Sequence, residues 1–361
     1  MRKSNGFKLR VLIVAFSLAF ATACTPISDS QEVQDEGKAG DNGVSLNDYY
    51  PFIHDSLYEY EGRGNEFAEQ SVFLEYENGQ RGQYRNINPG TETVRIVERT
   101  ADSVREIYLE GEFYHTENIL STSGIKNNVL LKEPLEKGNS WELEEGYIRE
   151  ITGLDVMIET PYGTFNALEV TTYLDEDRLQ KNYYAKDIGM VAVLYFDGET
   201  EISSLLSDII EGPYEKDIRL YYPLESNNEI TLRYVDHIFN FNTNDQLENI
   251  FEDLFKNPVE EGLTRVISQD TMINSVFLDK GTWTVKVDFT SELIPGWNAG
   301  SYPEWMLINS IVNTFGEFYD TDKVYISIDG VPFTSGHYEL PENEVFEVDT
   351  EGIEEYDISD E

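Results

Sequence analysis

The chain has 361 residues, and its 26 lysines and arginines against 69 aspartates and glutamates give a formal net charge of −43. This charge excludes general nucleic-acid binding, because phosphates are repelled wherever a local basic patch is missing, and the sequence has no such patch. One cysteine excludes an internal disulfide and a cysteine-based zinc site, and four dispersed histidines argue against a histidine metal cluster, so we expect no cofactor. The length suggests two folded domains, and an apolar fraction of 40% is enough to build their cores.

The amino terminus has the pattern of an export signal. Residues 1–10 contain four basic side chains and no acid, and residues 11–21 are apolar apart from one serine. At about 1.5 Å per residue, a helix over this apolar run falls well short of the ~30 Å hydrocarbon core of a bilayer. Residues 1–23 are therefore predicted to be a cleaved signal peptide rather than a membrane-spanning helix.

The predicted signal ends at the only cysteine of the chain, in the sequence Ala21-Thr22-Ala23-Cys24. Small residues at 21 and 23 suit an ordinary signal peptidase. The cysteine directly after them resembles a bacterial lipobox, in which the thiol is diacylated and becomes the mature amino terminus, although a lipobox usually has leucine where this chain has Ala21. We favour cleavage between Ala23 and Cys24 and lipid attachment at Cys24, which would anchor the protein stably through two acyl chains.

The excess of acid has two interpretations. Hydrated carboxylates keep a protein soluble in a saline or alkaline exterior, and they can also bind cations. We favour the first, because no D-x-D-x-D-G loop of the calcium-binding type occurs in the sequence.

Residues 24–46 lack aromatic side chains and hydrophobic periodicity, and we expect them to form a flexible tether. Residues 47–206 contain short segments of alternating polar and apolar side chains, separated by turn residues such as Asn78-Gly79 and Asp197-Gly198. Alternation with turns every ~8–12 residues predicts an antiparallel all-β domain with no long helix. This region only loosely resembles β-rich modules of uncharacterised bacterial envelope proteins.

The pattern changes after residues 211–213, and residues 214–349 mix strand and helix signals. Capping boxes begin at Thr243 and Ser301, and apolar stripes at helical spacing follow both of them. We predict a two-layer α+β sandwich of two helices on a mixed sheet, followed by an acidic tail over residues 350–361. In chain order, the predicted elements are strands at 218–222 and 230–238, a helix over 247–255, hairpin strands at 273–278 and 282–289, a helix whose apolar face runs from 308 to 318, and strands at 324–328 and 331–333.

These segments resemble, in order, the GerMN domain, the sporulation and spore-germination domain of Gram-positive bacteria. The chain departs from the family pattern at Gln269-Asp270, where the family often has a proline-containing loop, and in an insert over residues 295–300. The resemblance implies an exported lipoprotein of a Gram-positive bacterium whose domain acts as an interaction module, and it implies no catalytic residues. The residues that carry it are 218–222 (IRLYY), 232–235 (LRYV), 247–255, 261–267 (EGLTRVI), 275–277, 281–290, 308–315, 324–330 and Gly336-His337.

No catalytic constellation emerges from the sequence. There is no G-x-S-x-G elbow and no glycine-rich loop of the kind that cradles phosphates. With 69 acids, any search for a paired-carboxylate site returns a match and so has no meaning. The histidines lie far apart in the sequence, and we expect structural roles for all four. The chain is therefore predicted not to be an enzyme. These histidines are His54, His115, His237 and His337.

Three residues are candidates for binding. Trp297 and Tyr302 flank a glycine-rich loop, where a tryptophan either docks a glycan or a protein or fills the edge of the domain core. Arg233 lies in a predicted strand, on the face opposite Leu232 and Tyr234, where it either contacts a partner or ties the sheet to a carboxylate.

The functional hypothesis is a non-enzymatic interaction or scaffold role at the outer face of the membrane, in sporulation, germination or envelope-complex assembly. The expected partners are proteins of the envelope or of a sporulation complex and the membrane itself, through the lipid anchor. Peptidoglycan is a further candidate. Two alternatives stay open: a glycan-binding accessory of a cell-wall enzyme, and a β module that carries a ligand.

Overall fold

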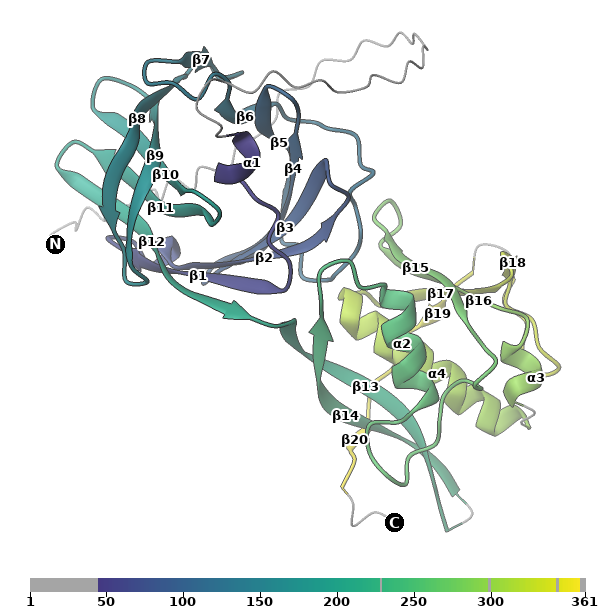
Figure 1. Cartoon of the computed structure of the whole chain (residues 1–361). Helices are drawn as coiled ribbons and strands as arrows, with labels where there is room; N and C mark the ends of the chain where they lie inside the picture. The colour runs from purple at the N-terminus through teal and green to yellow at the C-terminus, as the bar shows by residue number, and fades with distance from the viewer. Residues whose placement is uncertain (1–44, 228, 298–299, 342–343, 358–361) are drawn as a thin grey trace, which may run out of the picture. The chain divides into compact units, whose positions relative to one another are not determined.

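A computed structural model describes residues 45–227, 229–297, 300–341 and 344–357 (Figure 1). The predicted signal peptide, the lipid-attachment site and nearly all of the tether lie outside these ranges. The described residues are mostly β, with one large antiparallel sheet and four α-helices, and they belong to one compact unit. This confirms a mostly β protein with a large antiparallel sheet. None of the helices among these residues combines the length and the apolarity needed to cross a bilayer.

The large sheet is a twelve-stranded meander in the order β6-β5-β4-β3-β2-β1-β12-β11-β10-β9-β8-β7. Every pair is antiparallel, and short turns join most neighbours, as turn residues between alternating segments predict. Its strands are β1 (Ser56–Arg63), β2 (Gln70–Glu77), β3 (Arg81–Asn88), β4 (Thr91–Arg99), β5 (Ser103–Gly111), β6 (Asn128–Lys132), β7 (Ser140–Glu142), β8 (Ile148–Glu159), β9 (Thr164–Tyr173), β10 (Arg178–Ala185), β11 (Gly189–Asp197) and β12 (Thr200–Glu211).

The large sheet curves until its two edge strands approach each other (Figure 1). The indole nitrogen of Trp141 on β7 donates a hydrogen bond of 3.0 Å to the carbonyl of Val129 on β6. The short helix α1 (Leu46–Tyr49) places Leu46, with Tyr50 just after it, in the core inside this curve. The curved sheet is thereby filled with side chains, among them Leu74, Leu168 and Leu206.

Strands β2 to β5 are buried on both faces. On β2, Val72 and Leu74 belong to the core inside the curve, whereas Phe73 and Tyr76 belong to a second core shared with the C-terminal residues. A bulge between Leu74 and Tyr76 interrupts the regular alternation of the strand. Because both faces are covered, polar residues of these strands, such as Gln83, also lie in the interior.

The C-terminal elements, residues 214–357, build two smaller sheets and three helices. A three-stranded sheet has the order β13-β14-β20, and a further sheet has the order β15-β16-β17-β18, with β19 paired to β17. Their bounds are β13 (Tyr214–Ser226), β14 (Glu229–Phe241), α2 (Leu247–Lys256), β15 (Ile273–Asp279), β16 (Thr284–Phe289), α3 (Leu293–Trp297), α4 (Ser301–Tyr319), β17 (Lys323–Ile328), β18 (Val331–Pro332), β19 (Phe346–Glu347) and β20 (Glu354–Glu355).

Phenylalanine rings hold α2 and α4 together. Phe251 on α2 has its ring centroid 4.8 Å from that of Phe315 and 4.9 Å from that of Phe318, both on α4. Phe255, one turn further along α2, meets Phe315 edge to face at 5.5 Å. These contacts use the apolar stripes that helical spacing predicts for both segments.

Both predicted capping residues are wrong. The helix α2 begins at Leu247 with Gln246 as its N-cap, and α4 already includes Ser301, with Gly300 as its N-cap. Thr243 has another use: its hydroxyl donates to the carbonyl of Leu74 at 2.8 Å and so ties the start of this segment to β2. A long-range partner therefore replaces the local cap.

Two further details differ from expectation. Trp283 is not part of a strand, because it adopts a left-handed backbone conformation with φ 52° and β16 begins only at Thr284. Its ring is 49% exposed instead of sharing the buried face of Val285 and Val287. In addition, the short helix α3 occupies part of the segment that was expected to be an insert loop.

Candidate functional site

Three aromatic side chains, Trp305, Tyr338 and Phe346, lie together near the amino-terminal end of α4, and Tyr302 lies in the first turn of the same helix. Tyr302 and Trp305 are 55% and 38% exposed, although both belong to large ring types that usually pack inside. The ring of Tyr338 lies 5.4 Å from that of Trp305 at an interplanar angle of 31°, and the ring of Phe346 lies 6.5 Å from it. We call Tyr302, Trp305, Tyr338 and Phe346 the aromatic surface.

Hydrogen bonds and strand pairing hold the rings of the aromatic surface in place. The hydroxyl of Tyr302 donates to the carbonyl of Ile230 on β14 at 3.0 Å, and the hydroxyl of Tyr338 donates to the carbonyl of Ser301 at 3.0 Å. Phe346 belongs to β19, which pairs with β17. Rings fixed in this way lose little side-chain entropy when a partner covers them.

A buried carboxylate lies directly beside this surface. Glu304, in the first turn of α4, accepts a hydrogen bond from the Ser335 hydroxyl, and its Oε2 lies 2.8 Å from Nδ1 of His337. A histidine oriented by a carboxylate can serve as a catalytic base, but here the neighbouring hydroxyl bonds the carboxylate and not the imidazole. The arrangement therefore pins the loop at residues 335–338 to α4 and offers no activated nucleophile.

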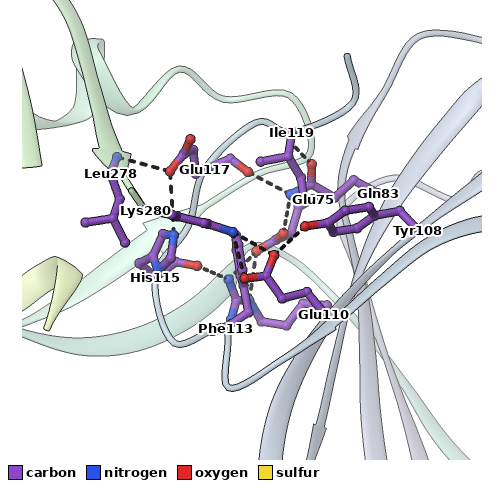
Figure 2. Close-up of polar contacts among 11 residues, drawn as sticks. Glu75, Gln83, Tyr108, Glu110, Phe113, His115, Glu117, Ile119, Leu278 and Lys280 are labelled. Atoms are coloured by element: carbon purple, nitrogen blue, oxygen red, sulfur yellow. Dashed lines mark hydrogen bonds and ion pairs between the residues drawn. The ribbon is translucent and has the colours of Figure 1, made fainter. Parts of the chain in front are cut away.

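A second polar cluster lies where the large sheet meets the C-terminal elements (Figure 2). Arg85 on β3 is 1% exposed, and its Nε donates to Oε1 of Glu75 at 2.7 Å, while a second ion pair joins it to Glu92. Its remaining donors reach the carbonyls of Phe113 and His115. Burial lowers the pKa of Arg85, but Glu75, Tyr214 and Glu92 together more than offset this, so that the net pKa is raised and the guanidinium stays charged.

This cluster extends to the C-terminal elements through the segment that connects β5 to β6. Gln83 binds both Glu75 and the backbone carbonyl of Glu117, with its amide nitrogen at 2.8 and 2.7 Å. The backbone nitrogen of Leu278 on β15 donates to Oε2 of Glu117, and Lys280 forms an ion pair with Glu110 at 2.6 Å (Figure 2). The arginine and the lysine of the cluster each have a carboxylate partner, which is typical of a structural tie and not of a reaction centre.

In the ranges that the structure describes, no group of three or more His, Cys, Asp or Glu side chains is placed to hold a metal ion. The four histidines occupy separate surroundings. His54 lies beside Glu77, His115 lies between Phe113 and Tyr319, and burial lowers the pKa of His237.

Residues 219–334 match the family model named Germane, described as sporulation and spore germination. This segment is a Germane domain. The resemblance predicted from the sequence is thereby confirmed over these residues. No curated protein matches the chain.

Solved structures similar to the chain include the tandem GerMN domains of the sporulation protein GerM from Bacillus subtilis, at 22% identity and a TM-score of 0.30. That match covers 37% of this chain, and the chain spans 45% of the GerM structure. A Bacteroides fragilis protein described as exported, with a YmcC-like fold, matches at 11% identity over 45% of this chain and 99% of its own, with a TM-score of 0.29. A candidate lipoprotein from Clostridium perfringens matches at 17% identity over 38% of this chain and 92% of its own, with a TM-score of 0.24.

All three predicted binding residues lie within the Germane segment, but Trp297 and Tyr302 have different partners. Tyr302 belongs to the aromatic surface. Trp297 ends α3, donates from its indole nitrogen to the carbonyl of Val266 at 2.8 Å, and packs its ring 6.0 Å from the buried ring of Phe333. Trp297 is half-buried and fills the edge of the domain core.

Arg233 lies on β14, apart from these rings. Its guanidinium is 3.8 Å from the carboxylate of Glu354 on β20, the short strand that pairs in parallel with β14. This geometry is that of a cation tying the sheet to a carboxylate.

The sequence analysis missed Trp305, Tyr338 and Phe346. Trp305 is three residues after Tyr302, a spacing that places both side chains on the same face of a helix, and this signal was available in the sequence. Tyr338 and Phe346 lie far along the chain and reach the aromatic surface only through the fold, because β19 pairs with β17.

Proposed function

We propose that the protein is an extracytoplasmic, lipid-anchored component of a sporulation or envelope complex, and that its Germane domain binds a partner protein without catalysis. The aromatic surface is the observation that carries this proposal. Exposed tryptophan and tyrosine with fixed rings are the side chains most often found at the energetic centre of protein interfaces. The match to a family described as sporulation and spore germination supports the same class of process.

The proposal predicts that Tyr302→Ala combined with Trp305→Ala removes the partner. We expect at least a tenfold loss of specifically enriched proteins, because truncating one central aromatic residue of an interface often costs about 2 kcal/mol or more. The measurement is quantitative pull-down mass spectrometry of the lipidated full-length protein from its own cells, in vegetative and in sporulating cultures.

The matched control is Tyr162→Ala, which removes a similarly exposed ring from the large sheet, 47% exposed, and should leave the captured proteins unchanged. Capture of the same envelope or sporulation proteins by the double variant contradicts the proposal. If the wild type retains only wall fragments and the double variant loses them, peptidoglycan is the ligand and the interaction is not with a protein.

The lipid anchor is the second part of the proposal. Cys24→Ser is expected to move most of the protein from the membrane fraction to the medium and wall fractions, since each buried acyl methylene contributes ~0.8 kcal/mol to membrane binding. Membrane fractionation and labelling with a fatty-acid analogue measure this, and Ser28→Ala is the control. Unlabelled protein that still sediments with the membrane contradicts lipidation.

A further inference from the structure

The curved large sheet contains a partly open cavity of about 50 Å³. Its walls are mostly apolar or aromatic, and they come from β1 to β4, β11 and the segment after α1. The residues that matter to its chemistry are Tyr50, Tyr58, Tyr60, Tyr84, Arg95 and Met190.

Arg95 is an unusual residue for such a place. It lies on β4 directly opposite Tyr84 of β3, while its neighbours Val94 and Ile96 belong to the core on the other face of the sheet. Arg95 therefore faces the inside of the curve, with its Cζ 5.4 Å from the centre of the Tyr84 ring. Its Nε is buried and has no hydrogen-bond partner.

The guanidinium also lacks a counter-ion. Within residues 45–357, as far as the structure describes them, no carboxylate forms an ion pair with Arg95. The carboxylate of Glu106 acts on the Arg95 guanidinium only at long range, without an ion pair. It forms its own ion pair with Lys126, at 3.8 Å. Arg95 is half-buried, and a cation without an ion pair is costly in such a place, a cost that a methionine or leucine at the same position would avoid.

The two buried arginines of the large sheet, Arg85 and Arg149, are satisfied by protein groups. Arg149 donates to the hydroxyl of Thr172, to the side-chain oxygen of Asn128 and to the carbonyl of Val129, at 2.8, 3.0 and 2.6 Å. Arg95 differs from Arg149 because the space in front of it is a cavity and not a set of acceptors.

Of the four tyrosines that line the cavity, two have a hydroxyl that is already hydrogen-bonded and two, Tyr50 and Tyr84, do not. The hydroxyls of Tyr58 and Tyr60 donate to the carbonyls of Ile188 and Met190, at 3.2 and 2.8 Å. For the hydroxyls of Tyr50 and Tyr84, the described residues supply no hydrogen-bond partner, although both side chains line the cavity. A guanidinium and two phenol donors around one space are the groups that bind a carboxylate.

We propose that this cavity binds a small organic carboxylate, whose head pairs with Arg95 and accepts hydrogen bonds from Tyr50 and Tyr84, and whose short apolar body lies against Leu74 and Met190. The volume limits the ligand, because a cavity that binds benzene has a volume of ~150 Å³. About 50 Å³ therefore suits carboxylates of about two to four carbons. This binding site is independent of the aromatic surface of the Germane domain.

The test is isothermal titration of the full chain, in a buffer free of organic acids, with acetate, propionate, butyrate, octanoate, chloride and inorganic phosphate. We expect saturable one-to-one binding of at least one short carboxylate and at least a tenfold weaker response to chloride and phosphate. Arg95→Met should weaken this binding at least a hundredfold. Arg105→Met, which removes an equal charge from an ion pair with Glu98 outside the cavity, should leave it unchanged.

Thermal unfolding supplies a readout that a purely structural role of Arg95 would not give. Without ligand, Arg95→Met should be as stable as the wild type or more stable, because it removes a half-buried cation that has no ion pair. If Arg95→Met does not fold, the double variant Tyr50→Phe and Tyr84→Phe tests the same site and should weaken binding at least tenfold. Binding that survives these changes, equal responses to chloride and butyrate, or no saturable binding of any short carboxylate overturns the proposal.

Discussion

Arg85→Met is expected to lower the free energy of unfolding by about 3–5 kcal/mol, the range found when one partner of a buried ion pair is removed. The change leaves the carboxylate of Glu75 without its cation in a site where that side chain is 0% exposed. It also frees the backbone carbonyls of Phe113 and His115, which Arg85 holds at the edge of the second core. Urea unfolding followed by circular dichroism measures the loss.

A surface arginine provides the matched control for this prediction. Arg63 pairs with Glu61 at 2.7 Å, but both side chains are largely exposed, so Arg63→Met should cost at most about 1 kcal/mol. The double variant Glu75→Gln and Arg85→Met should recover part of the stability, because it removes both buried charges together. A loss below about 1 kcal/mol for Arg85→Met alone would show that water or another group compensates Glu75.

The loss of stability expected for Arg85→Met affects the Germane domain as well as the large sheet. Arg85 and Gln83 hold the segment of residues 113–119, and this segment supplies Glu117 to the backbone of Leu278 and His115 to the ring of Tyr319. Loss of the arginine therefore loosens a connection on which β15 and the end of α4 rely.

The sequence predicted the large sheet because its signals are local. Turns such as Asn78-Gly79, between β2 and β3, and Asp197-Gly198, between β11 and β12, depend on residues that are adjacent in the chain. Alternation then assigns one face to the core. It cannot show that β2 to β4 bury both faces, and so it gives no sign that Glu75, Gln83 and Arg85 are among the most buried polar groups.

The same limit explains the errors in the C-terminal elements. Thr243 and Ser301 begin sequences with the composition of capping boxes, yet Thr243 binds β2, and Glu304 of the second box binds Ser335 and His337. A cap is predictable only while no distant group competes for the same side chain. The sequence predicted only part of the aromatic surface for a similar reason. Tyr302 follows a glycine-rich segment and could be identified as a candidate, whereas Phe346 reaches the surface only because β19 pairs with β17.

The protein is also expected to unfold cooperatively between about pH 10 and 12. Burial raises the pKa of Tyr58, Tyr184 and Tyr214 to about 12, and it also raises the pKa of Tyr60 and Tyr84. In the unfolded chain a tyrosine titrates near pH 10. The stability that these neutral phenols provide is therefore complete below about pH 10 and is lost as the pH rises through the values of the folded state.

The free energy associated with these raised pKa values is large enough to unfold the protein. A pKa raised by two units corresponds to about 2.7 kcal/mol for one group, and the three tyrosines with a pKa of about 12 together account for about 8 kcal/mol, which is comparable with the 5–15 kcal/mol by which a typical domain is stable. Circular dichroism and phenolate absorbance should change together as the pH is raised, because the buried phenols ionise only when the sheet opens. Phenolate absorbance that rises fully before the circular dichroism changes would show that water reaches these rings in the folded state.

Single substitutions identify which rings control this transition. Tyr214→Phe and Tyr184→Phe remove a buried ionisable hydroxyl, and each should move the midpoint of alkaline unfolding to higher pH. Tyr302→Phe, at an exposed position, is the control and should leave the midpoint unchanged. Because Tyr214 lies against Arg85, with the guanidinium carbon 5.6 Å from its ring, Arg85→Met removes a nearby positive charge that lowers the pKa of Tyr214. The two variants should therefore be non-additive if combined, and their interaction energy would measure how strongly the buried ion pair and the tyrosine ring depend on each other.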